Sequence, residues 1–317
     1  MSDALFDPHG ILLRRDAVAR GLDDNWLARM VRSAGLIHVR HGAYADPAVW
    51  IPATPVERHD LRARAVMQQY DDRVALSHMS AVVRRGGPNW GLDLSNVHLT
   101  NLFGRGDRIQ AGITHHRGVC RAGDVSRTDS HWITSPARNA METAQLSGRD
   151  AAVAVLDWFL NNNLTSTDEC SPLVDPLMRE WPGSIDLGAR LALARPKRAS
   201  VGETRTGLFL HDWSYPEPDC QWRVDRPDGR IAGVVDFVLH RERLMIEFDG
   251  QIKYGRLLKP GQTIADVIQA ERARERLLED LTGYRMFRLV WSELERPAEL
   301  DARLRNAIAN NLRVRAS

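Results

Sequence analysis

The sequence of 317 residues lacks the features that mark several classes of protein. Its three cysteines, Cys120, Cys170 and Cys220, are too few and too widely spaced to predict a disulfide framework or a zinc site of paired cysteines. The first ten residues, MSDALFDPHG, have neither the basic nor the apolar region of a signal peptide. The apolar stretch AAVAVLDWFL is interrupted by Asp157 and is too short to span a bilayer. We therefore expect a cytoplasmic protein.

The chain also lacks an excess of charge of either sign. Its 43 Lys and Arg residues against 41 Asp and Glu residues leave a formal net charge of only +2. A nucleic-acid partner would therefore have to be bound by a local basic surface. Hydrophobic residues make up 43% of the chain, which is typical of folded domains rather than disordered ones. The length suggests about two domains.

Residues 11–46 predict two short helices followed by a hairpin. RRDAVARGL forms the first helix, which ends near Gly21, and NWLARMVRSAG forms the second, which begins after an aspartate cap and ends at Gly35. Alternating residues and a glycine turn in LIHVRHGAYA predict the hairpin. This order of elements is that of a winged helix-turn-helix, and the alternative is a small helical cap on a larger domain.

The second of these helices carries candidate DNA contacts. Asn25, Arg29 and Arg32 fall on a face separate from its apolar residues and lie about one helical turn apart. In a winged helix-turn-helix such residues dock toward the major groove, and the hairpin residue Arg40 would lie against the DNA backbone.

The middle of the sequence, residues 55–170, alternates strand-like and helical segments, with a helix expected to begin at Ser135-Pro136. His115, His116 and His131 are conceivable metal ligands. Adjacent residues on a strand point to opposite faces, however, which argues against such a site. A stretch rich in proline and arginine, residues 171–198, predicts a linker to a separate C-terminal domain.

The strongest signal is a set of carboxylates in GVVDFVLHRERLMIEFDG, which predicts two strands joined by the turn HRER. If His240 lies opposite Arg243, the register places Asp236 directly opposite Glu247, and Asp249 shares the face of Glu247. A turn of odd length would instead put Asp236 and Glu247 on opposite faces.

Carboxylates paired across a ladder repel each other unless a cation or a proton neutralises them. Oxygen ligands favour Mg²⁺ or Mn²⁺, which could polarise a phosphodiester and activate a water molecule. Lys253 could stabilise the developing charge, or it could be a solvated loop residue. Upstream, Ser200 and Glu203 form the pattern of a helix capping box, and a glutamate in a first helical turn could also face the metal.

A further helix is predicted over TIADVIQAERARERLLEDLTG, which begins after Thr263 and ends at Gly283. Its arginines, Arg272, Arg274 and Arg276, are consistent either with a solvated face of ion pairs or with contacts to phosphates.

Over residues 199–295 these motifs resemble the PD-(D/E)XK nuclease fold, in the subgroup that resembles very-short-patch repair endonucleases. The matching positions are the acids Glu203, Asp236 and Glu247 and the pair Asp249-Gly250. The resemblance implies an endonuclease in which Asp236 and Glu247 hold Mg²⁺ or Mn²⁺, with Glu203, Asp249 and Lys253 in the site and Arg272 on DNA. Two positions depart from the pattern: Asp249 replaces the usual lysine, which would make Lys253 a migrated substitute, and the histidine that often follows the Asp-Gly pair is absent.

The N-terminal half is similar to the AbiEi-type antitoxins of toxin–antitoxin systems. Three segments carry this similarity: residues 11–46, SHMSA at residues 77–81, and ITSPARNAMETA at residues 133–144. The resemblance implies sequence-specific DNA binding with autoregulation, and a toxin or other defence-system protein as a partner.

Together these observations predict an α+β N-terminal region with a winged helix-turn-helix and a C-terminal α/β domain of the PD-(D/E)XK type. The expected parts are residues 1–50, 51–170, a linker at 171–198, and 199–317. The leading hypothesis is a metal-dependent nuclease that binds and cleaves DNA, with a homodimer as one expected state. The alternative is an AbiEi-like repressor or antitoxin whose nuclease-like domain is inactive. A third hypothesis is a protein-interaction module without a DNA role.

Overall fold

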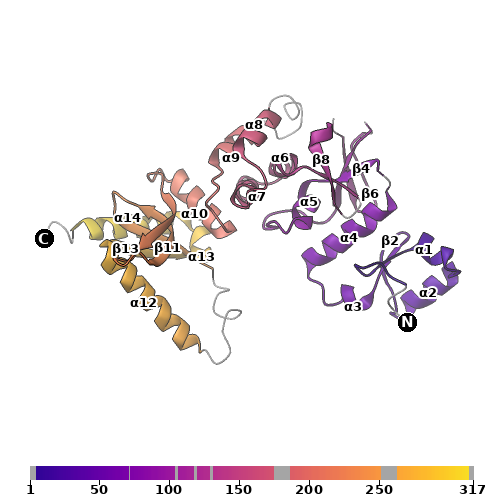
Figure 1. Ribbon diagram of the computed structural model, residues 1–317, viewed down its shortest axis with the longest axis horizontal. Coiled ribbons are helices and arrows are strands. Elements are labelled where there is room, and N and C mark those ends of the chain that lie inside the picture. The colour runs from indigo at the N-terminus through magenta and orange to yellow at the C-terminus, as the bar shows by residue number, and fades with distance from the viewer. Residues whose placement is uncertain are drawn as a thin grey trace. The chain divides into compact units, whose positions relative to one another are not determined.

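The computed structural model describes residues 5–70, 72–103, 106–117, 120–128, 131–174, 186–250 and 263–313. Helices and three mixed or antiparallel sheets alternate along the chain, which confirms the expected α+β class (Figure 1). The chain divides into two compact units, the first of residues 1–159 and 163–192 and the second of residues 160–162 and 193–317. Within the described ranges, no helix is both long enough and apolar enough to cross a membrane.

The first unit begins with a small sheet and two helices. In chain order these elements are β1 (Ile11–Leu13), α1 (Arg14–Ala19), α2 (Asp24–Arg32), β2 (Ile37–Arg40), β3 (Ala43–Ala45) and α3 (Pro47–Trp50). The strands pair in the order β1-β3-β2. Asp23 caps α2 by accepting a hydrogen bond of 2.7 Å from the amide of Trp26. The two helices and the hairpin thus occur where the sequence predicts them, and β1 adds a third strand.

The rest of the first unit is built around a six-stranded sheet of order β6-β7-β5-β4-β9-β8. Its elements are α4 (Pro55–Gln69), β4 (Val74–Leu76), α5 (His78–Arg84), β5 (Val97–Asn101), β6 (Arg108–Gln110), β7 (Ile113–Arg117), the 3₁₀ turn η1 (Ala122–Asp124), β8 (Val125–Thr128), β9 (His131–Thr134), α6 (Pro136–Leu146), α7 (Arg149–Asn161), α8 (Thr167–Val174) and α9 (Leu187–Leu193). The sheet is mixed: β5·β7 and β4·β9 are parallel pairs, and the other pairs are antiparallel. Helix α6 begins at Pro136, as predicted.

Part of the stretch predicted as a linker, residues 171–198, is folded. Helix α9 lies within it, and Leu187 and Leu191 are buried. Arg190 donates hydrogen bonds to the carbonyl oxygens of Ala144 and, at 2.9 Å, Ser147, at the end of α6. A pair of leucines four residues apart is enough to bury one side of a short helix. The helix was not predicted because prolines and arginines dominate the surrounding sequence.

The second unit has one four-stranded sheet with helices beside it. Its elements are α10 (Val201–Asp212), β10 (Asp219–Asp225), β11 (Ile231–Leu239), β12 (Leu244–Asp249), α12 (Ile264–Thr282), β13 (Arg285–Val290), α13 (Trp291–Leu294) and α14 (Pro297–Arg313). The strands follow the order β10-β11-β12-β13, antiparallel except that β13 runs parallel to β12. Ser200 and Thr263 cap α10 and α12, and Gly283, at φ 67°, ends α12, all as predicted.

Helix α10 approaches β12 closely at Gly202. A Cβ atom at this position would lie only 2.1 Å from the ring of Phe248. We expect Gly202→Ala to lower the free energy of unfolding of the second unit by about 1–3 kcal/mol, because the ring has to shift. Gly188→Ala in α9 is the control, since it meets only Val174 at 3.8 Å and gains helix propensity. Urea denaturation measures both, and equal stabilisation by the two variants would contradict the expected close packing.

Candidate functional site

The strands β11 and β12 form the hairpin that carries the predicted carboxylates. Phe237 pairs with Ile246 and Leu239 with Leu244, and the amide of Arg243 donates to the carbonyl oxygen of His240 at 3.2 Å. The predicted register is therefore confirmed. Its continuation by one residue places Asp236 opposite Glu247.

The regular alternation of side chains along β11 is interrupted at Asp236. Val235 packs in a cluster with Leu278 of α12, whereas Phe237, two residues on, packs in the core cluster on the other side of the sheet. On β10, Gln221 lies between the partners of these two residues and has a left-handed φ of 53°. Left-handed non-glycine residues cost energy and gather at functional sites. Asp236 itself accepts a hydrogen bond of 2.9 Å from the amide of Phe248.

Glu247 is buried, with 6% of its surface exposed, on the side of the sheet that faces α12. One carboxylate oxygen, Oε1, is paired with Arg274 of α12, and the other, Oε2, lies 3.1 Å from Arg288 of β13. Arg288 is also the register partner of Glu247 on the parallel strand. Burial raises the pKa of Glu247, although the two guanidinium groups oppose this shift.

The two arginines extend the ion-pair network to α12. Arg288 lies 2.6 Å from Glu271 and 3.0 Å from Glu275, and Arg274 lies 3.1 Å from Glu271. Arg274 belongs to the ERARER segment that the sequence assigns either to ion pairs or to phosphates, and it makes ion pairs. Arg272 of the same segment is exposed. The role of Arg288 was missed, because parallel pairing of β12 with a strand across α12 has no local signal in the sequence.

Two further acids, Glu203 and Asp249, are predicted for the site. Glu203 is buried at the start of α10, where it accepts hydrogen bonds from Ser200 Oγ at 2.7 Å, the amide of Ala199 at 2.9 Å and Gln221 Nε2 at 3.0 Å. It therefore stabilises the helix start and contacts β10. Asp249 is half-buried at the end of β12. Lys253 lies outside the described residues.

The predicted DNA contacts of the N-terminal region fall into two groups. Asn25, Arg29 and Arg32 are all exposed on α2, while Leu27 of the same helix is buried. Arg40, by contrast, is half-buried and donates a hydrogen bond of 2.7 Å to Gln69 at the end of α4. Burial lowers the pKa of Arg40. The structure thus turns Arg40 toward α4, where it is less exposed than the other three.

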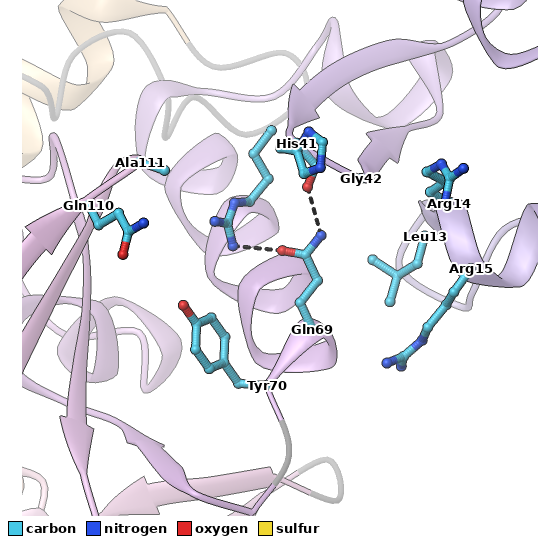
Figure 2. A pocket seen from close by; sticks show the side chains of 10 residues that line it. Leu13, Arg14, Arg15, His41, Gly42, Gln69, Tyr70, Gln110 and Ala111 are labelled. Carbon is cyan, nitrogen blue, oxygen red and sulfur yellow. Dashed lines mark hydrogen bonds between the residues drawn. The ribbon is translucent and has the colours of Figure 1, made fainter. Parts of the chain in front are cut away.

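Arg40 borders a cavity of about 610 Å³ (Figure 2), lined by Leu13, Arg14, Arg15, Arg40, His41, Gly42, Gln69, Tyr70, Gln110 and Ala111. Gln69 donates to the carbonyl oxygen of His41 at 2.9 Å. Arg14 is held by two hydrogen bonds of 2.6 Å to Asp24, at the start of α2. Three arginines therefore line the cavity, and one of them, Arg14, also bonds to helix α2, which carries the exposed Asn25, Arg29 and Arg32.

A second set of titratable groups lies on the six-stranded sheet and the adjoining start of α5. His78, His98 and His116 each offer a ligand atom within 4.8 Å of the others, the only such group of three or more His, Cys, Asp or Glu found in the described part of the chain. Nδ1 of His98 is 2.9 Å from Nε2 of His116, and the His78 and His116 rings stack at 3.7 Å. Burial lowers the pKa of His98 to about 4 and that of His116 to about 2.

The neighbouring His115 faces the opposite side of β7, where its Nε2 lies 3.3 Å from the hydroxyl of Tyr70. The prediction that adjacent histidines diverge is therefore confirmed. Sequence reasoning missed the grouping of His116 with His78 and His98. The signal available was the recurrence of histidine on apolar strands, VHLTN and ITHHR, and after a strand in SHMSA.

Comparisons with known proteins provide little information about these sites. No family model and no curated protein matches the chain. Among solved structures, it is similar to the crystal structure of the RV2827C protein from Mycobacterium tuberculosis, with 15% identity and a TM-score of 0.38 over 70% of this chain and 85% of that one.

Proposed function

We propose that this chain binds DNA and that its second unit hydrolyses DNA phosphodiesters with a divalent metal ion. One observation carries the proposal: the register that pairs Phe237 with Ile246, continued by one residue, brings Asp236 beside Glu247 on the neighbouring strand, close enough for Asp236 to help raise the pKa of Glu247. The elements around them follow the order helix, three antiparallel strands, helix and a parallel fourth strand. This order supports the PD-(D/E)XK type that the sequence motifs predict.

The donor set suits the expected metal ion. Carboxylate oxygens of Asp236 and Glu247 are the ligands that Mg²⁺ and Mn²⁺ prefer, and one or two carboxylates are enough when substrate phosphates complete the shell. The bound ion would polarise the phosphodiester and lower the pKa of the attacking water. Arg274 and Arg288 hold Glu247 in position, and the amide of Phe248 holds Asp236.

DNA would be held by basic side chains of both units. On α2, Asn25, Arg29 and Arg32 form an exposed face of the size that a recognition helix presents to the major groove. On α12, the exposed Arg272 and Arg276 lie four residues apart and are free of the ion-pair network around Glu247, so they are suited to backbone phosphates.

A second function is favoured by the arginines on Glu247. Both of its carboxylate oxygens lie against guanidinium groups, so a metal ion would have to compete with two fixed positive charges. An AbiEi-like repressor or antitoxin needs no metal at this position. In that case the second unit would contribute DNA binding or dimerisation, and the arginines would be the permanent partners of Glu247.

A cleavage assay separates the two functions. The full chain is incubated with supercoiled and linear DNA in Mn²⁺ or in EDTA, beside Asp236→Ala/Glu247→Ala and a control variant, Asp228→Ala/Glu299→Ala, which removes two exposed acids of the same unit. We expect wild type and control to cut DNA in Mn²⁺ alone, and the site variant to leave it intact while retaining its circular-dichroism spectrum.

The repressor function predicts a different result. All three proteins would then shift the mobility of DNA and leave every form uncut, with or without metal. Cleavage that persists in Asp236→Ala/Glu247→Ala would also overturn the proposal, because it would place the chemistry elsewhere.

A further inference from the structure

The histidine group of the first unit is assembled from three separate elements. His78 is the first residue of α5, His98 lies on β5 and His116 lies on β7. In the parallel β5·β7 pair, His98 is the partner of Thr114, two residues before His116, so both histidines point to one face. Because α5 begins at that face, His78 joins them, and only 2% of its surface is exposed.

A buried carboxylate adjoins this group. Glu142 of α6 is fully buried, and its Oε1 accepts a hydrogen bond of 2.7 Å from Arg138. Its other oxygen, Oε2, has no hydrogen-bond partner among the described residues and lies 3.8 Å from Nδ1 of His78. A buried charged oxygen without a partner is costly, and such groups in folded proteins call for an explanation such as a bound ion.

The backbone at His78 is also unusual. Its φ of 50° is left-handed, and the amide Nδ2 of Asn139 on α6 holds its carbonyl oxygen at 2.8 Å. Ser77 Oγ lies 2.9 Å from Nδ1 of the ring. The strained backbone fixes the position of the His78 ring. Its Nδ1 lies near a hydroxyl and a carboxylate, which are the kinds of group that orient the ring of a metal-binding histidine.

We propose that His78, His98 and His116 bind one Zn²⁺-type transition-metal ion, with Glu142 as its charge partner. Three imidazoles suit Zn²⁺, Cu²⁺ or Ni²⁺ and do not suit Mg²⁺, which prefers oxygen. Zn–N bonds of about 2.0–2.1 Å in a tetrahedral centre separate the nitrogens by about 3.3 Å. Binding therefore requires small ring movements: His98 Nδ1 and His116 Nε2, which lie 2.9 Å apart, have to separate slightly, and the stacked His78 and His116 rings have to turn apart.

Such an ion would tie α5 to the parallel strands β5 and β7, which are distant in sequence. Since an ion that binds only the folded state stabilises it, the first unit should melt at a higher temperature with Zn²⁺ than in EDTA. This site is independent of the carboxylates of the second unit.

The test compares adjacent residues of β7. Full-length wild type, His116→Asn and the matched control His115→Asn are stripped with EDTA, dialysed, and titrated with Zn²⁺ by calorimetry and with Co²⁺ by visible absorption. We expect wild type to bind one equivalent of Zn²⁺, and His115→Asn to retain this affinity within about threefold. His116→Asn should weaken binding by at least about 100-fold, since removal of an outer partner alone costs about 10- to 100-fold.

Two further variants make the outcome decisive. His98→Asn should repeat the loss, with circular dichroism as the check of folding, while Asp236→Ala/Glu247→Ala should bind Zn²⁺ as wild type does. Absence of Zn²⁺ binding by wild type at micromolar concentrations would overturn the proposal, as would equal affinities of His116→Asn and His115→Asn. The three histidines would then be a metal-free packing arrangement.

Discussion

Arg138→Met is expected to destabilise the first unit by about 3–5 kcal/mol, because it removes the charge that two buried carboxylates share. Arg138 is 1% exposed, and it lies 2.7 Å from Glu142 and 3.0 Å from Asp124. Methionine keeps much of the volume, so the loss reports charge rather than a cavity. Glu142 would then be buried with neither of its oxygens paired to an arginine. Urea denaturation followed by circular dichroism, in EDTA, measures the change.

The double variant Arg138→Met/Glu142→Gln completes this test. Removing the second charge should recover a large part of the loss, because the cost arises from an unpaired buried charge and not from the missing guanidinium. The control is Arg14→Ala, because Arg14 forms its ion pair with Asp24 at the exposed surface. We expect this variant to have the same free energy of unfolding as wild type. If Arg138→Met were as stable as Arg14→Ala, the buried network would have no role in stability.

Local sequence signals predicted much of the second unit. The HRER turn fixes the register of β11 and β12, so the pairing of Phe237 with Ile246, next to Asp236 and Glu247, follows from counting residues. Ser200, Thr263 and Gly283 mark helix ends through contacts within a few residues of the chain. Each of these features depends on neighbours in the sequence, which is why pattern and spacing are sufficient.

Features that depend on parallel pairing were not predicted. Arg288 reaches Glu247 because β13 returns beside β12 after the long helix α12, and no residue near either strand specifies that register. The histidine group has the same origin, since His98 and His116 meet through the parallel pair β5·β7. Parallel strands are joined by long crossovers, so their alignment is set by packing of the whole unit rather than by a turn.

The inward position of Arg40 has a different cause. Alternation in IHVR predicts Val39 inward and Arg40 outward, but the pairing of β2 with β3 shifts register between His38 and Arg40, and Gln69 at the end of α4 accepts a hydrogen bond of 2.7 Å from Arg40. A side chain as long as arginine can bury its stem and still reach a polar partner. Sequence alternation gives the direction of a side chain and does not show which neighbouring element will meet it.

The exposed face of α2 leads to the other large expected effect. Arg29→Ala/Arg32→Ala should weaken DNA binding about 10- to 100-fold at low salt, and should reduce the slope of log affinity against log salt by about 2, because each lost phosphate contact releases about 0.9 fewer counterions. Both side chains are exposed, so the melting temperature should not change. Electrophoretic mobility shifts at several salt concentrations, with one DNA fragment, measure the affinity and the slope.

The matched control for this variant is Arg223→Ala/Arg230→Ala, which removes two exposed arginines from the second unit, each already paired with a nearby aspartate. Net charge falls equally in the two variants, so any difference reports where DNA is bound and not the total charge. An unchanged affinity and slope in Arg29→Ala/Arg32→Ala would exclude α2 as a DNA contact. If neither variant altered binding while the cleavage assay left DNA intact, the protein-interaction hypothesis would take precedence over both DNA functions.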